Sequence, residues 1–470
     1  MRSLDEPINR AFDNSKPAFF QDKPESQSIM SIDTTQDYVA FLGIDWASKS
    51  HAMSLQSASG DQWEDATISS CPKRVDQFIA ELKERFGNGP IAVGVEMSKG
   101  ALIDQLQTHD CFDIYPINPA TSTRYRKAFT PSGAKDDLPD ARLHRDLIRL
   151  HRERFRVLQP VSDADRRLDT LTKARRKLCD HRKELENKLR NNLKDYYPLA
   201  LEVAGELKKP MGCAFLLKWP DQPSLLRARR TTIESFYRKA GSRSSHRIAE
   251  RLEMIEAATV LTDNPAINEP MAAYTISLVR QITVLNEEIA KFDKQIAEVY
   301  AEHPDADLWK SFPGSGSVMA PRLAAAWTMD RSRFCEARAM QLYSAIAPVR
   351  ENSGESEWIH RRWSKPQFLH QTFWEYAHHS VHHCRWANAF VASQMAKGKK
   401  RSTALRALAF KWQRIMFRCW QDEKPYDDEA YEEQLRKRNS PFAEPKKEIK
   451  KSGSPEVAGG ETSAQNSQNP

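Results

Sequence analysis

The order of apolar and polar positions divides the chain into two parts of different construction. From residue 38 onward, short apolar runs are separated by polar turns, which is typical of strands. The runs that predict strands are 38–45, 51–56, 62–68, 90–96 and 112–117. Apolar residues at helical spacing predict helices over 75–86, 100–109, 119–129 and 138–150. Strands joined by short turns and then alternating with helices predict a mixed α/β sheet.

Beyond about residue 160 the pattern is mostly helical. Leu171, Leu178, Leu185 and Leu189 form a partial heptad stripe that basic residues interrupt. A cleaner stripe, in which the steps alternate between four and three residues, consists of Leu278, Ile282, Leu285, Ile289, Phe292, Ile296 and Val299. This spacing predicts a coiled coil or a long antiparallel helix pair. Packing within the chain and dimerisation explain the stripe equally well.

The fold class expected from these patterns is α/β plus α, with polar segments at both ends. Residues 1–37 have no apolar periodicity, and residues 426–470 are dominated by Pro, Lys, Glu and Ser, so we expect both segments to be disordered. Between them we expect three domains. These are an α/β domain at 38–158, a coiled-coil helical region with an insert at 159–304, and a mainly helical domain at 305–425.

Composition restricts the cellular setting. Charged residues make up 29% of the 470 positions and the mean hydropathy is −0.67. No apolar run approaches the roughly 18 residues that span a bilayer, and the N-terminus lacks the pattern of a secretory signal. The seven cysteines are scattered and form no C-x-x-C pair, which favours a reducing compartment. We therefore expect a cytoplasmic, nucleoid-associated protein without a membrane partner.

The net charge of +8 is concentrated in basic clusters. One cluster covers 121–156 and a second follows at 166–190. Clustered Arg and Lys are typical of proteins that bind a phosphate backbone, and a solvated helix face is the alternative. The candidate nucleic-acid-binding residues are Arg124, Arg126, Lys127, Lys135, Arg142, Arg350, Arg361, Arg362 and Lys365.

Four acidic residues stand in similar backbone contexts. Asp45 ends the first strand and Glu96 ends the strand at 90–96, while Asp137 and Asp140 share one face at the start of a helix. If the two strands are neighbours, all four carboxylates converge, and their repulsion then implies bound cations. Oxygen ligands of this kind suit Mg²⁺ or Mn²⁺. Two such ions can activate a nucleophile and stabilise the leaving oxygen of a phosphodiester.

Each acid has a simpler explanation when it is taken alone. Asp45 is then a turn residue, Glu96 a surface group at a strand end, and the acids at 136–140 a helix start favoured by the helix dipole. Asp136 also stands beside Asp137 and competes with it for the same role.

Several stretches together resemble one known family. They are GIDWASKSH (43–51), VGVEMS (93–98), AKDDLPDAR (134–142), FPGSGSVMAPRLAAAW (312–327) and QLYSAIAPVRENSG (341–354). Over roughly 38–420 the chain resembles the DEDD transposases of bacterial insertion sequences, the IS110 family, which is related to the invertase Piv. The family motif Lys-x-Asp-x-x-Asp-Ala selects Asp137 rather than Asp136.

The resemblance implies a RuvC-like, RNase H-fold domain, a coiled coil and a second transposase domain with a catalytic serine. Ser353, followed by Gly354, matches the position of that serine, whereas Asn-Ser-Gly taken alone predicts only a turn. A serine that attacks a phosphodiester forms a covalent phosphoserine. Ser315, Ser317 and Ser356 are weaker candidates because they do not match the family position. The family also implies donor and target DNA, a guide (bridge) RNA, and a homo-oligomer, dimer or tetramer, whose sites combine residues of two protomers.

Two further features stay open. The segment WSKPQFLHQTFWEYAHH (363–379) retains Lys365 but lacks the Gly and Asn usual for the family, so it departs from the family pattern. His378 with His382 and His379 with His383 form i,i+4 pairs beside Cys384, which fits a metal site, a packing role or a DNA-facing role.

We predict an RNA-guided DNA transposase or recombinase that uses metal ions at the four carboxylates and Ser353 as the nucleophile. One rival is a RuvC-like nuclease that hydrolyses branched DNA. Another is a non-catalytic, nucleic-acid-binding coiled-coil scaffold.

Overall fold

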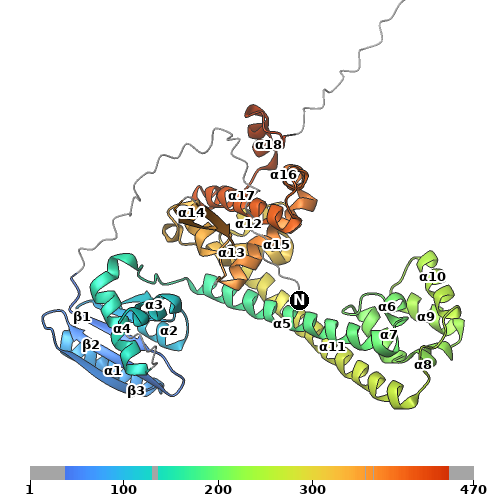
Figure 1. Cartoon of the computed structure of the whole chain (residues 1–470), viewed down its shortest axis with the longest axis horizontal. Coiled ribbons are helices and arrows are strands. Elements are labelled where there is room, and N and C mark those ends of the chain that lie inside the picture. The colour runs from blue at the N-terminus through green and yellow to red at the C-terminus, as the bar shows by residue number, and fades with distance from the viewer. Residues whose placement is uncertain (1–36, 130–135, 355, 364, 444–470) are drawn as a thin grey trace, which may run out of the picture. The chain divides into compact units, whose positions relative to one another are not determined.

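The computed structural model describes residues 37–129, 136–354, 356–363 and 365–443. Within these ranges the chain separates into two compact units, 37–161 and 162–443, which we call the sheet unit and the helical unit (Figure 1). The division lies near the expected end of the α/β domain at 158. No division occurs near 304, because the long helices and the C-terminal region belong to one unit. The segment 1–36 and Lys135 lie outside the described residues.

A five-stranded sheet in the order β3-β2-β1-β4-β5 forms the centre of the sheet unit. Its strands are β1 (Ala40–Asp45), β2 (Ser50–Ser57), β3 (Trp63–Ser69), β4 (Ile91–Val95) and β5 (Phe112–Pro116). β1, β2 and β3 run antiparallel as a meander, whereas β4 and β5 are parallel to β1. The mixed α/β sheet predicted from the apolar runs is confirmed.

Helices cover both faces of this sheet. They are α1 (Pro72–Phe86), α2 (Ala101–Gln107), α3 (Pro119–Phe129) and α4 (Asp137–His151), followed by a short 3₁₀ helix (Arg152–Arg154). Leu42 and Ile44 share one core with α1 and α2, while Phe41 and Ala92 share another with α4. Because neighbouring strand residues point to opposite faces, β1 is buried on both sides, which explains its continuous apolar sequence.

Two glycines bring α4 against the sheet. Gly43 of β1 and Gly94 of β4 are register partners on adjacent strands. A Cβ atom at Gly43 would overlap the carbonyl oxygen of Ala141, and one at Gly94 would overlap the carbonyl oxygen of His144. Only residues without a side chain allow this backbone approach, so the glycines fix where the first turns of α4 lie.

The helical unit is organised on two long helices, α5 (Asp163–Tyr196) and α11 (Pro265–Ala301). They are antiparallel, since Arg175 near the start of α5 pairs with Asp293, and Asn192 near its end donates a hydrogen bond to Thr275. The predicted stripe faces α5 and its surroundings within the same chain, with Leu278, Ile282, Ile289 and Ile296 buried. Of the two predicted arrangements, the structure agrees with a long antiparallel helix pair packed within the chain.

The insert between the long helices folds on one end of the pair. It contains α6 (Ala200–Val203), α7 (Pro210–Lys218), α8 (Gln222–Leu226), α9 (Arg230–Lys239) and α10 (Ser245–Glu256). Leu189 and Leu193 of α5 and Ile282 of α11 share a core with these helices.

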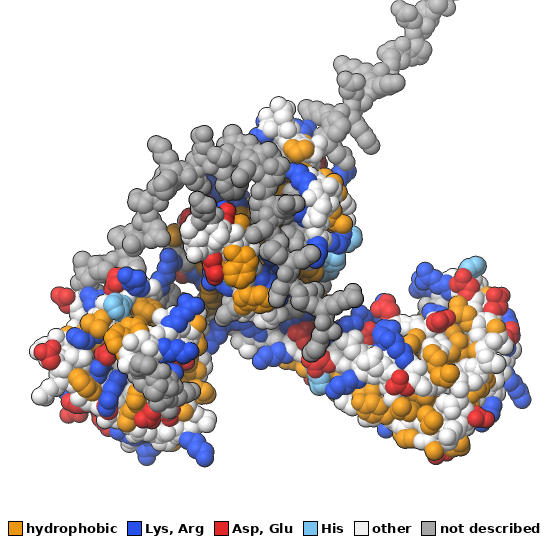
Figure 2. Space-filling model, viewed as in Figure 1, with side chains coloured by type: hydrophobic (Ala, Val, Ile, Leu, Met, Phe, Trp, Pro, Cys, Tyr) orange, Lys and Arg blue, Asp and Glu red, His pale blue; other side chains and the backbone are white. Residues whose placement is uncertain are grey.

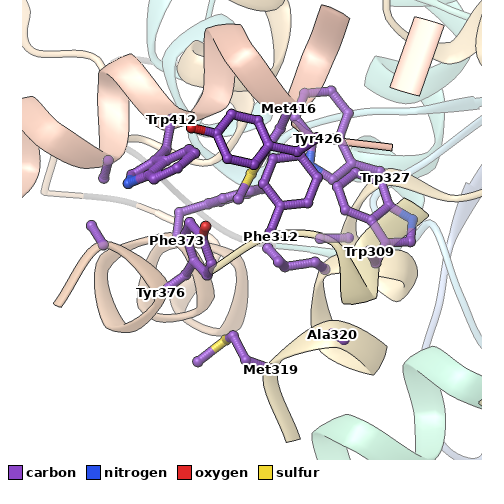
Figure 3. Close-up of a cluster of buried hydrophobic side chains, with 14 of the residues drawn as sticks. Trp309, Phe312, Met319, Ala320, Trp327, Phe373, Tyr376, Trp412, Met416 and Tyr426 are labelled. Atoms are coloured by element: carbon purple, nitrogen blue, oxygen red, sulfur yellow. The ribbon is translucent and has the colours of Figure 1, made fainter. Parts of the chain in front are cut away.

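The opposite end of the pair packs on the C-terminal helices. The elements there are α12 (Ala306–Lys310), α13 (Gly316–Trp327), a 3₁₀ helix (Arg331–Arg333), α14 (Ala337–Tyr343), β6 (Val349–Ser353), β7 (Ser356–His360), α15 (Gln367–His383), α16 (Arg385–Ala396), α17 (Arg401–Gln421) and α18 (Asp428–Lys437). Leu168 of α5 and Ile296 of α11 belong to the core of this region. Large aromatic side chains such as Trp309, Phe312 and Trp412 fill it (Figure 3).

The expected disordered tail from 426 is wrong for its first residues. Tyr426 is buried, its backbone N–H donates to Ser311, and its hydroxyl bonds to Trp386 and Asp428. Leu435 of α18 is also buried in this core. The prediction followed the charged composition of the segment and overlooked these two side chains, which pack in the core. Residues 444–470 lie outside the described part.

None of the helices that the structure describes is both long and apolar enough to cross a membrane.

Candidate active site

Two of the predicted carboxylates lie at adjacent strand ends. Asp45 is the last residue of β1, and Glu96 directly follows β4. Because β1 and β4 are parallel neighbours with Ile44 opposite Val95, the two carboxylates leave the sheet at the same edge. The structure therefore meets the condition on which convergence of the acids depended.

Helix α4 brings the other two acids to this edge. Asp137 is its first residue, and Asp140, on the next turn, is buried. Burial raises the pKa of Asp45; nearby His144 lowers it, and the negative charges of Asp140, Asp137 and Glu96 raise it again. Asp45 thus lies close enough to the other three carboxylates to be repelled by each of them.

Asp136 has a different position from its neighbour. Its backbone is extended and its carboxylate accepts a hydrogen bond from the N–H of Asp137, at 2.9 Å, as an N-cap does. This contact gives Asp136 a role in starting α4, so Asp137 is the better candidate for the carboxylate set.

Arg126 forms hydrogen bonds with both carboxylate oxygens of Asp140. From the last turn of α3, its Nε and Nη2 donate to Oδ1 and Oδ2 of Asp140, each at 2.7 Å. The Asp140 side chain is only 4% exposed, so the pair is largely shielded from water. A bidentate pair of this kind is strong and directional. Arg126 was expected to contact nucleic acid. In this structure it neutralises the carboxylate of Asp140 instead.

His144 is a site residue that the sequence interpretation missed. It lies one turn after Asp140, is fully buried, and its Nδ1 is 2.9 Å from the carbonyl oxygen of Ile44. Because a carbonyl oxygen only accepts, Nδ1 carries a proton. The other ring nitrogen lies 3.3 Å from Ser122 Oγ and 3.5 Å from Glu96 Oε1. This contact is the main reason that the pKa of Glu96 is lowered. The signal available in the sequence was the i,i+4 spacing from Asp140.

The carboxylate edge suits a divalent cation in its chemistry. Its donors are oxygens, and a cation there would offset both the burial and the acidic neighbours that raise the pKa of Asp45. In the described ranges, however, no three His, Cys, Asp or Glu side chains are gathered closely enough to hold one ion. The residues fit a metal in kind and share one edge of the sheet, but their side chains would have to move closer together, and Arg126 would have to release Asp140, before they could hold an ion.

Ser353 lies at an exposed turn of the helical unit. It is the last residue of β6, which pairs with β7 in an antiparallel hairpin, opposite Ser356. Gly354 follows with φ of 59°, a conformation that favours glycine at the turn. The Ser356 hydroxyl donates to the carbonyl oxygen of Ser353, and Ser353 is itself exposed.

The hairpin places Ser353 beside an aromatic side chain. Directly paired and alternate residues of a hairpin share a face, so Ser353, Ser356 and Trp358 project to the same side. Trp358 is 46% exposed and stacks on His360 with ring centroids 4.1 Å apart.

The other candidate basic residues have different surroundings. Arg124 and Lys127 are exposed on α3, and Arg362 is exposed after β7. Two of the candidates are already paired with acids: Arg142 with Asp65, and Arg350 with Glu357. Arg361 and Lys365 have no carboxylate partner among the described residues. Figure 2 shows Lys and Arg side chains on the visible surfaces of both units.

The histidine pairs of α15 lie against a turn. Gly314, with φ of 77°, approaches His379 and His383 so closely that a Cβ there would meet both residues. No metal-binding group of His, Cys, Asp and Glu is formed by this helix or elsewhere in the described chain. The contact supports a packing role for the Pro-Gly-x-Gly turn and for these two histidines.

Comparison with known proteins gives two family matches. The DEDD transposase model of IS110, described as "Transposase", matches residues 42–198, which include all four carboxylates. A second model, described as "Transposase IS116/IS110/IS902 family", matches residues 306–392, which include Ser353.

Relatives agree along most of their length. The chain is 26% identical over 396 residues to the mini-circle putative transposase for IS117 of Streptomyces coelicolor, covering 83% of this chain and 95% of that protein. It is 23% identical over 409 residues to an uncharacterized 43.6 kDa protein of insertion element IS110 from the same organism, covering 84% and 96%. An uncharacterized 44.8 kDa protein of IS116 from Streptomyces clavuligerus is 27% identical over 319 residues, covering 67% and 77%. Together these matches show that the chain belongs to the IS110 family of insertion-element transposases.

Proposed function

We propose that this transposase cuts and rejoins DNA through a covalent phosphoserine on Ser353, assisted by Mg²⁺ or Mn²⁺ at Asp45, Glu96, Asp137 and Asp140. The proposal is supported by the positions of Asp45 and Glu96 at the ends of the parallel neighbours β1 and β4, with Asp137 and Asp140 nearby in the first turn of α4. An antiparallel meander continued by parallel strands also supports assigning the sheet unit to the RuvC-like, RNase H fold.

The chemistry follows from the hydroxyl of Ser353. It loses its proton as Oγ bonds to phosphorus, the bond from phosphorus to one strand oxygen breaks, and that oxygen takes up a proton and leaves as a strand hydroxyl. In the rejoining step, the hydroxyl of a second strand attacks phosphorus, and Oγ leaves and regains a proton. The phosphodiester energy is kept in the covalent link, so rejoining needs no nucleotide cofactor.

The carboxylates would act on the same phosphate. When bound, the metal ions supply positive charge to the phosphate and favour loss of the attacking proton. Glu96 would be oriented by His144, whose ring is itself fixed by the Ile44 carbonyl. The exposure of Ser353 suits attack on a large substrate such as DNA.

Two further parts of the proposal rest on the family resemblance. One is a structured guide RNA that pairs with donor and target DNA. The other is a homo-oligomer, because strand exchange needs paired cleavages and one chain has one such serine. The α5–α11 stripe is filled within the chain, so the oligomer contact would use other faces of that helix pair.

A reconstituted assay tests the function. Protein purified with its bound RNA is mixed with donor and target DNA, and joined products are sequenced. We expect Asp45→Asn to abolish joining while nucleic-acid binding persists, and RNase treatment to abolish joining by the wild type. Undiminished joining by Asp45→Asn would contradict the role of the carboxylates, and the absence of any specific co-purifying RNA would contradict guidance.

A further inference from the structure

Three cations at the base of the β6–β7 hairpin have no acidic partner in the part of the chain that the structure describes. They are Arg361 and Lys365, which follow β7, and Arg406 on α17; we call them the cationic cluster. Two described acids of the same hairpin are paired elsewhere, Glu357 with Arg350 at 2.6 Å and Glu351 with His360 at 3.1 Å.

The members of the cluster lie close enough to repel one another. Burial, then Arg361 and Arg406, lower the pKa of Lys365; burial, then Arg361, lower the pKa of Arg406. The neighbouring His370 also has a lowered pKa, caused by burial and by the same two cations, Lys365 and Arg406. Like charges held together in partial burial cost free energy, and an anion would relieve that cost.

Two buried nitrogen atoms without hydrogen-bond partners also indicate a binding site for an anion. Nε of Arg406 is buried and has no hydrogen-bond partner, and the same is true of Nδ1 of His370. Buried polar nitrogens are nearly always hydrogen-bonded in folded proteins. These two atoms are therefore consistent with a ligand that completes the surroundings of the cluster.

An exposed aromatic ring adjoins the cluster. Trp363 is 68% exposed, and the guanidinium of Arg361 lies over its ring, 4.3 Å from the centroid. An aromatic ring beside cations is the arrangement with which proteins hold single-stranded nucleic acids, since the cations contact phosphates and the ring stacks on a base.

We propose that the cationic cluster binds a backbone phosphate of an unpaired nucleic-acid strand and that Trp363 stacks on an adjacent base. The inference rests on the proposed function only in that the chain handles nucleic acid. DNA and RNA strands share the recognised chemistry, whereas a paired duplex keeps its base faces covered.

Binding of short labelled strands tests this site. The full-length protein, freed of co-purified RNA, is titrated with a single-stranded DNA, an RNA of the same sequence and the corresponding duplex DNA, and fluorescence anisotropy is followed at several salt concentrations. Arg361→Ala, Lys365→Ala and Arg406→Gln are compared with Arg418→Ala, an exposed arginine of α17 that is paired with Asp422.

The expected results separate the two parts of the site. Each cluster variant should weaken single-strand binding several-fold and reduce the slope of log affinity against log salt by about 0.7, while Arg418→Ala should do neither. Trp363→Ala should weaken single-strand binding about tenfold and duplex binding much less, and Trp363→Phe should retain most of the affinity. The arm, DNA or RNA, that loses more affinity identifies the natural strand.

Unchanged affinity and salt slope in all three cluster variants would overturn the site, as would equal loss of single-strand and duplex binding in Trp363→Ala. Thermal unfolding identifies any variant that fails to fold, and the salt slopes of the cluster variants that do fold then decide the outcome. Failure of the phosphoserine mechanism would leave these binding results intact, because the assay involves neither Ser353 nor the carboxylates.

Discussion

Asp140 stands on a helix whose backbone touches two strands through glycines, whereas Ser353 stands at the exposed turn of a two-stranded hairpin. Around the first, Arg126 and His144 make contacts of 2.7 to 3.5 Å that restrict the carboxylates on several sides. Around the second, the strands of the hairpin are mostly exposed.

The contrast assigns different tasks to the two regions. Groups that bind a small ion need positions fixed to fractions of an ångström, and a core provides them. A nucleophile that must reach a phosphate in a large nucleic-acid substrate needs access more than support. Substitutions near the carboxylates should therefore disturb folding and chemistry together, while substitutions in the hairpin should disturb chemistry or binding alone.

The largest expected effect concerns the contact between α4 and the sheet that positions the carboxylates. Gly43→Ala should destabilise the sheet unit by about 3 kcal/mol or more, because the new Cβ meets the backbone of α4 and cannot be accommodated by a side-chain rotation. Calorimetry of the full chain should show the transition of the sheet unit shifted downward and that of the helical unit unchanged. Gly60→Ala is the matched control, since a Cβ there meets nothing within 4 Å. Equal stability of the two variants would show that α4 is not fixed by this contact.

A smaller effect concerns the pairing of Arg126 with Asp140. Without nucleic acid, Arg126→Ala should bind Mn²⁺ about tenfold more tightly than the wild type, because both oxygens of Asp140 become free for the ion, a difference of about 1.4 kcal/mol. Titration calorimetry measures this affinity, and Arg142→Ala, which releases Asp65 instead, should leave it unchanged. Weaker Mn²⁺ binding by Arg126→Ala would mean that the arginine organises the carboxylates instead of competing with the ion.

The smallest effect concerns pH. The pKa of Asp45 is raised in the folded chain by burial and by its acidic neighbours, so its charge opposes folding at neutral pH. That opposition should disappear as the pH falls through the raised pKa, whereas Asp45→Asn lacks it at every pH. Metal-free wild type should therefore be less stable than Asp45→Asn at pH 7 and approach it on acidification. A constant difference between pH 7 and pH 4 would contradict a pKa of Asp45 that burial and its acidic neighbours raise.

Much of the sheet unit was predictable from sequence because its signals are local. Continuous apolar runs identify β1 and β4, and an acid at each run end identifies Asp45 and Glu96. The Arg126–Asp140 pair was not predictable, since it depends on where α3 and α4 lie on the sheet. The spacing of His144 from Asp140 was a signal, but the contact of its ring with Glu96 depends on the same placement. In hindsight the glycines two residues before Asp45 and Glu96 were a signal, because they show which part of each strand a helix contacts.

The helical unit was harder to predict. Its apolar stripe fitted two arrangements equally, and only the position of α5 showed that the stripe packs within the chain. The C-terminal segment was interpreted from its average charge, which obscured Tyr426 and Leu435. The cationic cluster combines residues far apart in sequence, so spacing could not have revealed Arg406.

The central claim is that DNA is joined through Ser353 with help from the carboxylates. The most direct measurement is mass spectrometry of the protein–DNA adduct trapped during the reaction on donor and target DNA with the co-purified RNA. We expect a peptide carrying nucleotide on Ser353 in the wild type, and no adduct in Ser353→Ala or in Asp45→Asn. An adduct on another residue, or joined DNA formed by Ser353→Ala, would contradict it.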